Sequence, residues 1–238
     1  MSSSKITATF HGGLGALAGE VTINQAVIAG WTGRDPAAVE KHIKELEALG
    51  VKRPAATPIF YRVSAARITT AEAMEAAGEK SSGEVEFVLL SCNGQLWVGV
   101  GSDHTDREVE TYNVTVSKQM CDKPIATSFW PFADCAPHWD RLMLRSFIME
   151  TRHEGGQATT KRVLYQEGAV AGMIAPLDLI KRYTGKSELP DGTLMFCGTF
   201  AAKGGIRPAP RFEYELEDPV LGRRITAGYS ITCLPNVG

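Results

Sequence analysis

The chain has 238 residues, of which 44% are hydrophobic and 22% charged, a composition typical of a globular protein with a sizeable core. It has 25 basic and 27 acidic side chains and no basic run, which excludes nucleic acid and anionic membranes as expected partners and favours small molecules. The first residues, MSSSK, contain no apolar signal core, and no stretch approaches the about 20 apolar residues of a membrane helix, so we expect a cytoplasmic protein.

The chain begins with strand patterns. Alternation of Ile6, Ala8 and Phe10 and the apolar run 26–29 predict strands around a glycine-rich break at 12–15. The glycine spacing matches neither the dinucleotide-binding pattern nor the Walker pattern. We therefore interpret the break as a tight turn and predict no nucleotide site.

A helix is predicted from residue 35 to residue 49. Asp35 and Pro36 form a typical helix start, Gly50 is a typical stop, and four aliphatic residues between them follow helical spacing. His42 and Glu45 lie one turn apart at the edge of this apolar stripe, where they can form a hydrogen bond. Taken alone, such a histidine is more often packed or solvated than catalytic.

Residues 54–82 mix short extended pieces, among them 59–63, with a segment at 71–78 whose composition predicts a helix. An apolar strand follows at 83–90, and it contains Glu84 and Glu86 two residues apart. Side chains alternate along a strand, so the two glutamates share one face with aliphatic neighbours. Two half-desolvated like charges need raised pKa values or a compensating cation, and a hard divalent metal ion provides such a cation. An edge strand with both glutamates in water remains the alternative.

Asn93-Gly94 predicts a hairpin turn into a second strand at 96–100. That strand runs into a cluster of polar side chains at 101–108, which is typical either of a site or of a hydrogen-bonded turn.

Cys135 and His138 have the C-x-x-H spacing, but a zinc site needs a second pair that the sequence lacks. We interpret the five scattered cysteines as reduced, mostly packed thiols.

In the last third, 142–148 alternates as a strand, and 169–183 contains an amphipathic helix that ends near Gly185. A turn at 190–192 leads into the strand 193–197, which stops at Gly198-Thr199. The strand 212–217 alternates cleanly, and we expect its glutamates to face water. Since no linker divides the chain, we predict a single domain over 1–238.

The order of these segments resembles the catalytic domain of the fumarylacetoacetate hydrolase superfamily, which consists of metal-dependent enzymes that act on oxo acids. Within it, the chain looks most like an uncharacterised, domain-of-unknown-function branch. The motifs that carry the resemblance are Glu84-Val85-Glu86, the segment Ser102 to Glu108, Lys118, the turn from Asp191-Gly192 to Gly198-Thr199-Phe200, and the pair His42 and Glu45 on a candidate lid helix at 35–50. The resemblance implies an α+β fold, a mostly-β mixed sheet roll with a few peripheral helices, and a homodimer.

Four positions depart from the superfamily pattern. Ser102 replaces an asparagine, Glu108 an aspartate, Glu110 a glutamine that touches substrate in many members, and Phe200 a proline. These changes affect the substrate half of the expected pocket. They therefore leave the substrate open and the expected metal ligands intact.

By this resemblance, Glu84, Glu86 and Asp103 bind one Mg²⁺ or Mn²⁺, whose preference for oxygen ligands they match. His104 is expected to pack nearby without ligating. Lys118 supplies positive charge near a developing oxyanion.

The resemblance also implies that Arg107, Gly198 and Thr199 hold a substrate carboxylate, and that His42, oriented by Glu45, activates water when the lid closes. The function it implies is a metal-dependent hydrolase that cleaves a C–C bond in an oxo acid or 1,3-dicarbonyl compound through an enolate. The alternatives are an oxo-acid decarboxylase, a hydratase or dehydratase, a cyclic amide or lactone hydrolase, and a non-catalytic ligand-binding relative.

Overall fold

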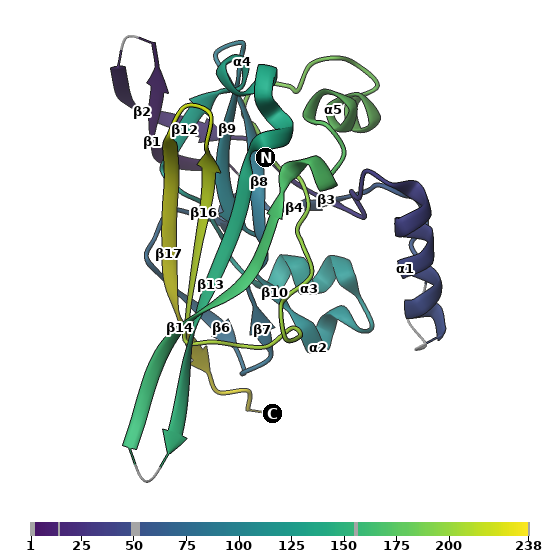
Figure 1. The fold of residues 1–238 in the computed structure, drawn as a ribbon, viewed down its shortest axis with the longest axis vertical. Helices are drawn as coiled ribbons and strands as arrows, with labels where there is room; N and C mark the ends of the chain where they lie inside the picture. Colours follow the sequence, from purple (N-terminus) through teal and green to yellow (C-terminus); the bar gives the residue numbers. More distant parts are fainter. Residues whose placement is uncertain (1–2, 14, 49–52, 155–156, 238) are drawn as a thin grey trace.

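A computed structural model describes residues 3–13, 15–48, 53–154 and 157–237, with the backbone alone at 42, 45, 46, 152–154, 157 and 158. About half of these residues form strands, most of which curl into two mixed sheets, and short helices lie around them (Figure 1). The predicted α+β, mostly-β architecture is therefore confirmed.

The larger sheet has the strand order β2-β1-β12-β9-β8-β15-β3-β4. Its neighbours are antiparallel, except that β1 pairs with β12 and β3 with β15 in parallel. The strands are β1 (Ser4–Gly12), β2 (Gly15–Ile23), β3 (Gln25–Gly30), β4 (Ile59–Val63), β8 (Val85–Cys92), β9 (Gln95–Ser102), β12 (Ser128–Pro131) and β15 (Thr193–Phe196).

The second sheet has the order β14-β13-β16-β17-β6. Its strands are β6 (Ala73–Ala77), β13 (Met143–Glu154), β14 (Gln157–Ala169), β16 (Arg211–Asp218) and β17 (Arg223–Leu234). Two short ladders complete the strands: β5 (Ile68–Thr69) with β11 (Lys123–Pro124), and β7 (Ser81–Ser82) with β10 (Thr105–Asp106).

The helices lie at the periphery, and α1 extends away from the sheets in Figure 1. They are α1 (Pro36–Ala48), α2 (Arg107–Glu110), α3 (Val114–Met120), α4 (Phe132–Cys135) and α5 (Pro176–Thr184), with 3₁₀ turns η1 (Ala65–Arg67), η2 (Ala136–Arg141) and η3 (Val170–Gly172). The predicted start of α1 is confirmed, because the Asp35 carboxylate accepts from the Ala37 N–H. The predicted end of the later helix, α5, is also confirmed, because Gly185 caps it in the left-handed conformation. Within the described part of the chain, no helix is both long and apolar enough to cross a bilayer.

Strand β8 lies between two apolar clusters, which explains its nearly continuous hydrophobic sequence. Val85, Phe87 and Leu89 belong to one cluster, and Val88 and Leu90 belong to the other. All five side chains are fully buried. The alternation predicted for this strand is therefore confirmed, and the face that carries the glutamates is not exposed to water along β8.

The helix predicted at 71–78 is wrong, because residues 73–77 form β6. Its side chains alternate between exposed and buried, and the inward-facing Met74 and Ala76 pack into the first apolar cluster. β6 pairs in parallel with β17 at the edge of the second sheet. Tertiary pairing with period-two burial therefore overrides the helical preference of Ala, Glu and Met.

The prediction that the β16 glutamates face water is wrong for Glu215, which is buried. Its carboxylate accepts from Arg145 Nη1 at 3.1 Å and lies 3.5 Å from Arg224 Nη1. Glu213 is half-buried and paired with Arg162 and Arg211. Arg211 of β16 itself and arginines from three other strands of the sheet (Arg145, Arg162 and Arg224) balance these charges. The sequence of β16 alone gives no sign of the three from other strands.

Cys135 and His138 lie where η2 meets the β16–β17 turn, and both contact residues of that turn. His138 Nε2 lies 2.9 Å from Asp218 Oδ1, Arg223 Nε donates to Asp218 Oδ2 at 3.1 Å, and Arg223 Nη2 donates to Cys135 Sγ at 3.3 Å. Asp218, which is fully buried, also accepts from the backbone N–H groups of the turn. This carboxylate is therefore the centre of the junction.

Asp218→Asn is expected to destabilise the protein by about 2 kcal/mol. Burial acts to raise the pKa of Asp218, but His138, the Leu221 N–H and Arg223 outweigh it and lower the pKa. A carboxyl with a lowered pKa contributes stability that is present above its unfolded pKa of about 3.9 and lost as pH falls through the folded pKa. Urea titrations at pH 7 and pH 3 should therefore show a difference that shrinks in acid. Asp134→Asn, at the exposed neighbour of Arg223, is the control, and a difference independent of pH would contradict this role.

Candidate metal centre

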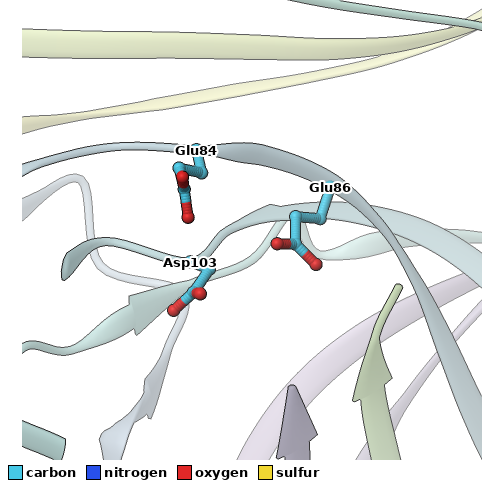
Figure 2. Close-up of side chains that lie close together, drawn as sticks. All are labelled: Glu84, Glu86 and Asp103. Carbon is cyan, nitrogen blue, oxygen red and sulfur yellow. The ribbon is translucent and has the colours of Figure 1, made fainter. Parts of the chain in front are cut away.

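Three carboxylates converge at the start of the β8–β9 hairpin. Glu84 immediately precedes β8, Glu86 is in β8, and Asp103 immediately follows β9. A carboxylate oxygen from each lies within 4.8 Å of the others. Figure 2 shows that the three side chains lie close together. Glu86 and Asp103 are buried, and the Glu84 side chain is 18% exposed.

The hairpin register explains why these residues meet. Asn93 and Gly94 both have positive φ, 54° and 70°, as a two-residue turn of this type requires, and they pair Cys92 with Gln95. Counting back along both strands brings Glu84 opposite Asp103, whose N–H donates to the Glu84 carbonyl at 3.0 Å. Directly opposed residues project from the same face. Glu86 lies two residues further along that face.

Crowding gives the carboxylates different protonation behaviour. Burial, together with the charges of Asp103 and Glu84, raises the pKa of Glu86 well above its usual range. Burial would also raise the pKa of Asp103, but Lys118 and Lys123 outweigh it and lower the pKa to about 2. The raised pKa predicted for the glutamate pair is therefore present at Glu86.

Two lysines hold Asp103. The Lys118 ammonium, from α3, contacts Asp103 Oδ2 and lies 3.9 Å from Glu84 Oε2. The Lys123 ammonium, from β11, lies 3.1 Å from Asp103 Oδ1 and also donates to the His104 carbonyl. Both lysines are buried. Lys118 was predicted from the sequence, whereas Lys123 was missed, because nothing near it in the sequence indicates a carboxylate partner.

Arg107 lies beside Glu84 but is already occupied by carboxylates. Its Nη1 donates to Glu84 Oε1 at 3.2 Å and to Glu110 Oε2 at 2.8 Å, and its Nε donates to Ser82 Oγ at 2.7 Å. Despite burial, Glu84 and Glu110 raise the pKa of Arg107. The guanidinium is therefore a fixed positive charge at the rim of the carboxylate group.

Gly198 and Thr199 lie on the other side of β8. The Gly198 N–H donates to Glu86 Oε2 at 2.6 Å. Its φ is +104°, and an added Cβ would lie 1.8 Å from Thr32 Oγ1, so only glycine fits this approach. The Thr199 hydroxyl donates to the Val85 carbonyl at 2.7 Å. Both residues thus contact the glutamate strand, and their predicted contacts with a substrate stay predictions.

Gln166, a buried residue of β14, connects this loop to β8 and was missed from the sequence. Its amide oxygen accepts from the Val85 N–H at 3.0 Å, and its amide nitrogen donates to Thr199 Oγ1 at 2.8 Å and to the Phe200 carbonyl at 2.6 Å. A polar residue in an otherwise alternating strand is the only sequence signal for it. Gln166 therefore ties both β8, next to Glu86, and the loop at 199–200 to the second sheet.

His104 is packed, as its sequence interpretation predicts. Its Nδ1 lies 2.7 Å from the Tyr229 hydroxyl, which in turn lies 2.8 Å from Ser102 Oγ. Burial, Lys123 and Arg107 lower the pKa of His104 to about 3, so the imidazole is neutral near pH 7. His42 and Glu45 belong to α1, but their side chains lie outside the described part of the structure.

The carboxylates fit a hard divalent cation. They offer three oxygen-donor side chains at close range, with a buried glutamate whose ionised form lacks sufficient compensation. Mg²⁺ and Mn²⁺ prefer such ligands and retain positions for water or substrate. The thiol of Cys197 is buried, and its pKa is raised by burial and by the charge of Glu86, which disfavours a thiolate ligand there.

The curled mixed sheets define the class of fold as fumarylacetoacetate hydrolase-like. Solved structures of 2-keto-3-deoxyarabinonate dehydratase are similar to this chain. The hexagonal crystal form has a TM-score of 0.57 at 15% identity, covering 91% of this chain and 75% of that chain. The complex with magnesium and 2,5-dioxopentanoate has a TM-score of 0.56 at 14% identity, covering 89% of this chain and 74% of that chain. At these identities the likeness concerns the fold alone.

The chain belongs to the DUF2848 family, a family of proteins of unknown function, whose sequence profile matches residues 29–229. This agrees with the branch predicted from the motifs. No curated protein matches the sequence.

Proposed function

We propose that this protein is a divalent-metal-dependent enzyme that acts on a small oxo acid or 1,3-dicarbonyl compound. The observation that carries the proposal is the buried group formed by Glu84, Glu86 and Asp103, which would hold Mg²⁺ or Mn²⁺. The fold supports it, since the similar dehydratase was solved with magnesium and 2,5-dioxopentanoate. The single domain, the homodimer and the cytoplasmic location belong to the same proposal.

When bound, the cation supplies a Lewis acid that polarises a carbonyl oxygen of the substrate. The chain's own residues supply fixed charge around it. Lys118 places an ammonium beside Glu84 and Asp103, where negative charge would develop on an oxygen of the substrate. Arg107 provides positive charge at the rim, and Gly198 and Thr199 border Glu86, where we propose that a substrate carboxylate is held.

Two reaction classes use this arrangement. Hydrolysis of a C–C bond needs an activated water. We assign its deprotonation to His42, oriented by Glu45, on the candidate lid helix. Elimination or decarboxylation needs mainly the stabilised negative charge, and the similar structures carry the name of a dehydratase, a lyase. Hydrolysis is our first candidate because of the H-x-x-E pair, and a lyase reaction is the second.

The test is a screen of acylpyruvates, oxaloacetate, hydroxylated 2-oxo acids and cyclic amides with Mg²⁺ or Mn²⁺. Turnover is expected for an oxo acid and should be lost in EDTA and in Glu86→Gln. His42→Ala should then abolish a hydrolysis but leave most of an elimination or decarboxylation. Turnover that persists in EDTA would overturn the proposed function, and turnover of cyclic amides alone would overturn the proposed substrate class.

A further inference from the structure

Both carboxylate oxygens of Asp103 are occupied by ammonium groups. Lys118 Nζ contacts Oδ2, and Lys123 Nζ lies 3.1 Å from Oδ1. A Mg²⁺ ion binds a carboxylate oxygen at about 2.0–2.1 Å, and it would repel an ammonium held on the same group by several kcal/mol even at an effective dielectric constant of about 20. A divalent ion on Asp103 would therefore lie beside an ammonium group unless one of the two lysines moved, and the repulsion between the two cations favours that movement.

Lys123 is the less able of the two to move. Its side chain is completely buried, and its ammonium also donates to the backbone carbonyl of His104. Its backbone is fixed in β11, which pairs with β5. This lysine thus has an acceptor that an ion at the carboxylates would leave in place.

The contacts of Lys118 are different. The two carboxylates within 3.9 Å of its ammonium, those of Asp103 and Glu84, are both expected metal ligands. Its ammonium also lies 5.8 Å from the centre of the ring of Tyr61 in β4, and this ring face offers a place for a displaced cation. Lys118 therefore occupies the same carboxylates that an ion would bind, and the Tyr61 ring offers its ammonium an alternative contact.

We propose that Lys118 is a tethered cation that covers Asp103 in the metal-free protein and is displaced from it when a divalent ion binds. The inference rests on the proposed metal site. Its consequence is that Lys118 lowers the affinity for metal, and that metal binding frees the ammonium for the oxygen of a substrate. Lys123 is a positioning residue that keeps Asp103 in place in both states.

Mn²⁺ affinity, measured by calorimetry and by electron paramagnetic resonance, separates the two lysines. Lys118→Met should bind Mn²⁺ at least about tenfold more tightly than wild type, because it removes the competing charge. Lys123→Met should bind more weakly, and Lys5→Met, an exposed lysine of β1, should not differ from wild type. If wild type binds Mn²⁺ and Lys118→Met binds it with equal or lower affinity, this inference is overturned while the proposed metal site is retained. No binding by wild type would overturn both.

A measurement on the wild-type protein does not depend on how the variants fold. The ¹⁵N signals of the lysine ammonium groups report their hydrogen bonds and their hydrogen exchange with water. Mg²⁺ should shift the Lys118 signal and speed its exchange, while the Lys123 signal stays protected. An unchanged Lys118 signal at saturating Mg²⁺ would overturn the proposed displacement.

Discussion

Replacement of Glu86 by glutamine is expected to lower the affinity for Mn²⁺ by at least about 100-fold and yet to stabilise the metal-free protein. Glu86 is buried beside Glu84 and Asp103, and its raised pKa means that ionising it at pH 7 costs folding free energy. Glutamine has no such cost, and its amide oxygen can still accept from the Gly198 N–H. The variant thus exchanges metal binding for stability.

The pH dependence follows from the sign of that shift. A carboxyl whose pKa is raised on folding destabilises the fold only above its unfolded pKa of about 4.3, and increasingly so up to the folded pKa. In EDTA, urea titrations should therefore show Glu86→Gln to be more stable than wild type at pH 7 but not at pH 4. Added Mn²⁺ should raise the melting temperature of wild type alone.

Glu84→Gln is the matched variant for this experiment. It also removes a predicted ligand, but Glu84 is partly exposed and pairs with Arg107 at 3.2 Å, so its loss should not stabilise the protein. Mn²⁺ affinity that is unchanged in both variants would rule out the metal assignment. Stabilisation by both would show that general carboxylate repulsion, rather than burial of Glu86, sets the effect.

The family resemblance, rather than local sequence patterns, predicted the group of three carboxylates, but their proximity has a local physical basis. The E-x-E strand, the Asn-Gly turn and the second strand are adjacent in the sequence, and a two-residue turn allows only one register. That register alone brings Glu84 opposite Asp103. Proximity of the three carboxylates therefore follows from a single hairpin of about 20 residues, which needs no knowledge of the rest of the fold.

The partners of these carboxylates come from distant segments, and this is why the sequence did not reveal them. Lys123 reaches Asp103 because β11 pairs with β5, and Gln166 reaches Val85 because β14 packs in the other sheet. Neither contact has a local pattern. The helix predicted at 71–78 is wrong for the same reason, because the strand conformation of β6 depends on its pairing with the distant β17.

Asp103→Asn is expected to affect stability in the opposite direction from Glu86→Gln, although both residues are predicted ligands of the same ion. The carboxylate of Asp103 is fully buried between Lys118 and Lys123, and they lower its pKa to about 2. Asparagine would remove the counter-charge of Lys123 and leave Lys118 only the more distant carboxylate of Glu84, at 3.9 Å. Breaking a buried ion pair in this way costs about 3–5 kcal/mol.

Lys118 can then be replaced in the Asp103→Asn background. Lys118→Met should recover part of the lost stability, because a buried ammonium left with only the distant Glu84 carboxylate disappears together with its desolvation cost. The two substitutions should be non-additive by about 1–3 kcal/mol. Urea titrations of the two single variants and the double variant in EDTA measure this coupling. Strictly additive effects would mean that Lys118 and Asp103 do not interact in solution. The Lys118 ammonium would then not be the group that a divalent ion displaces.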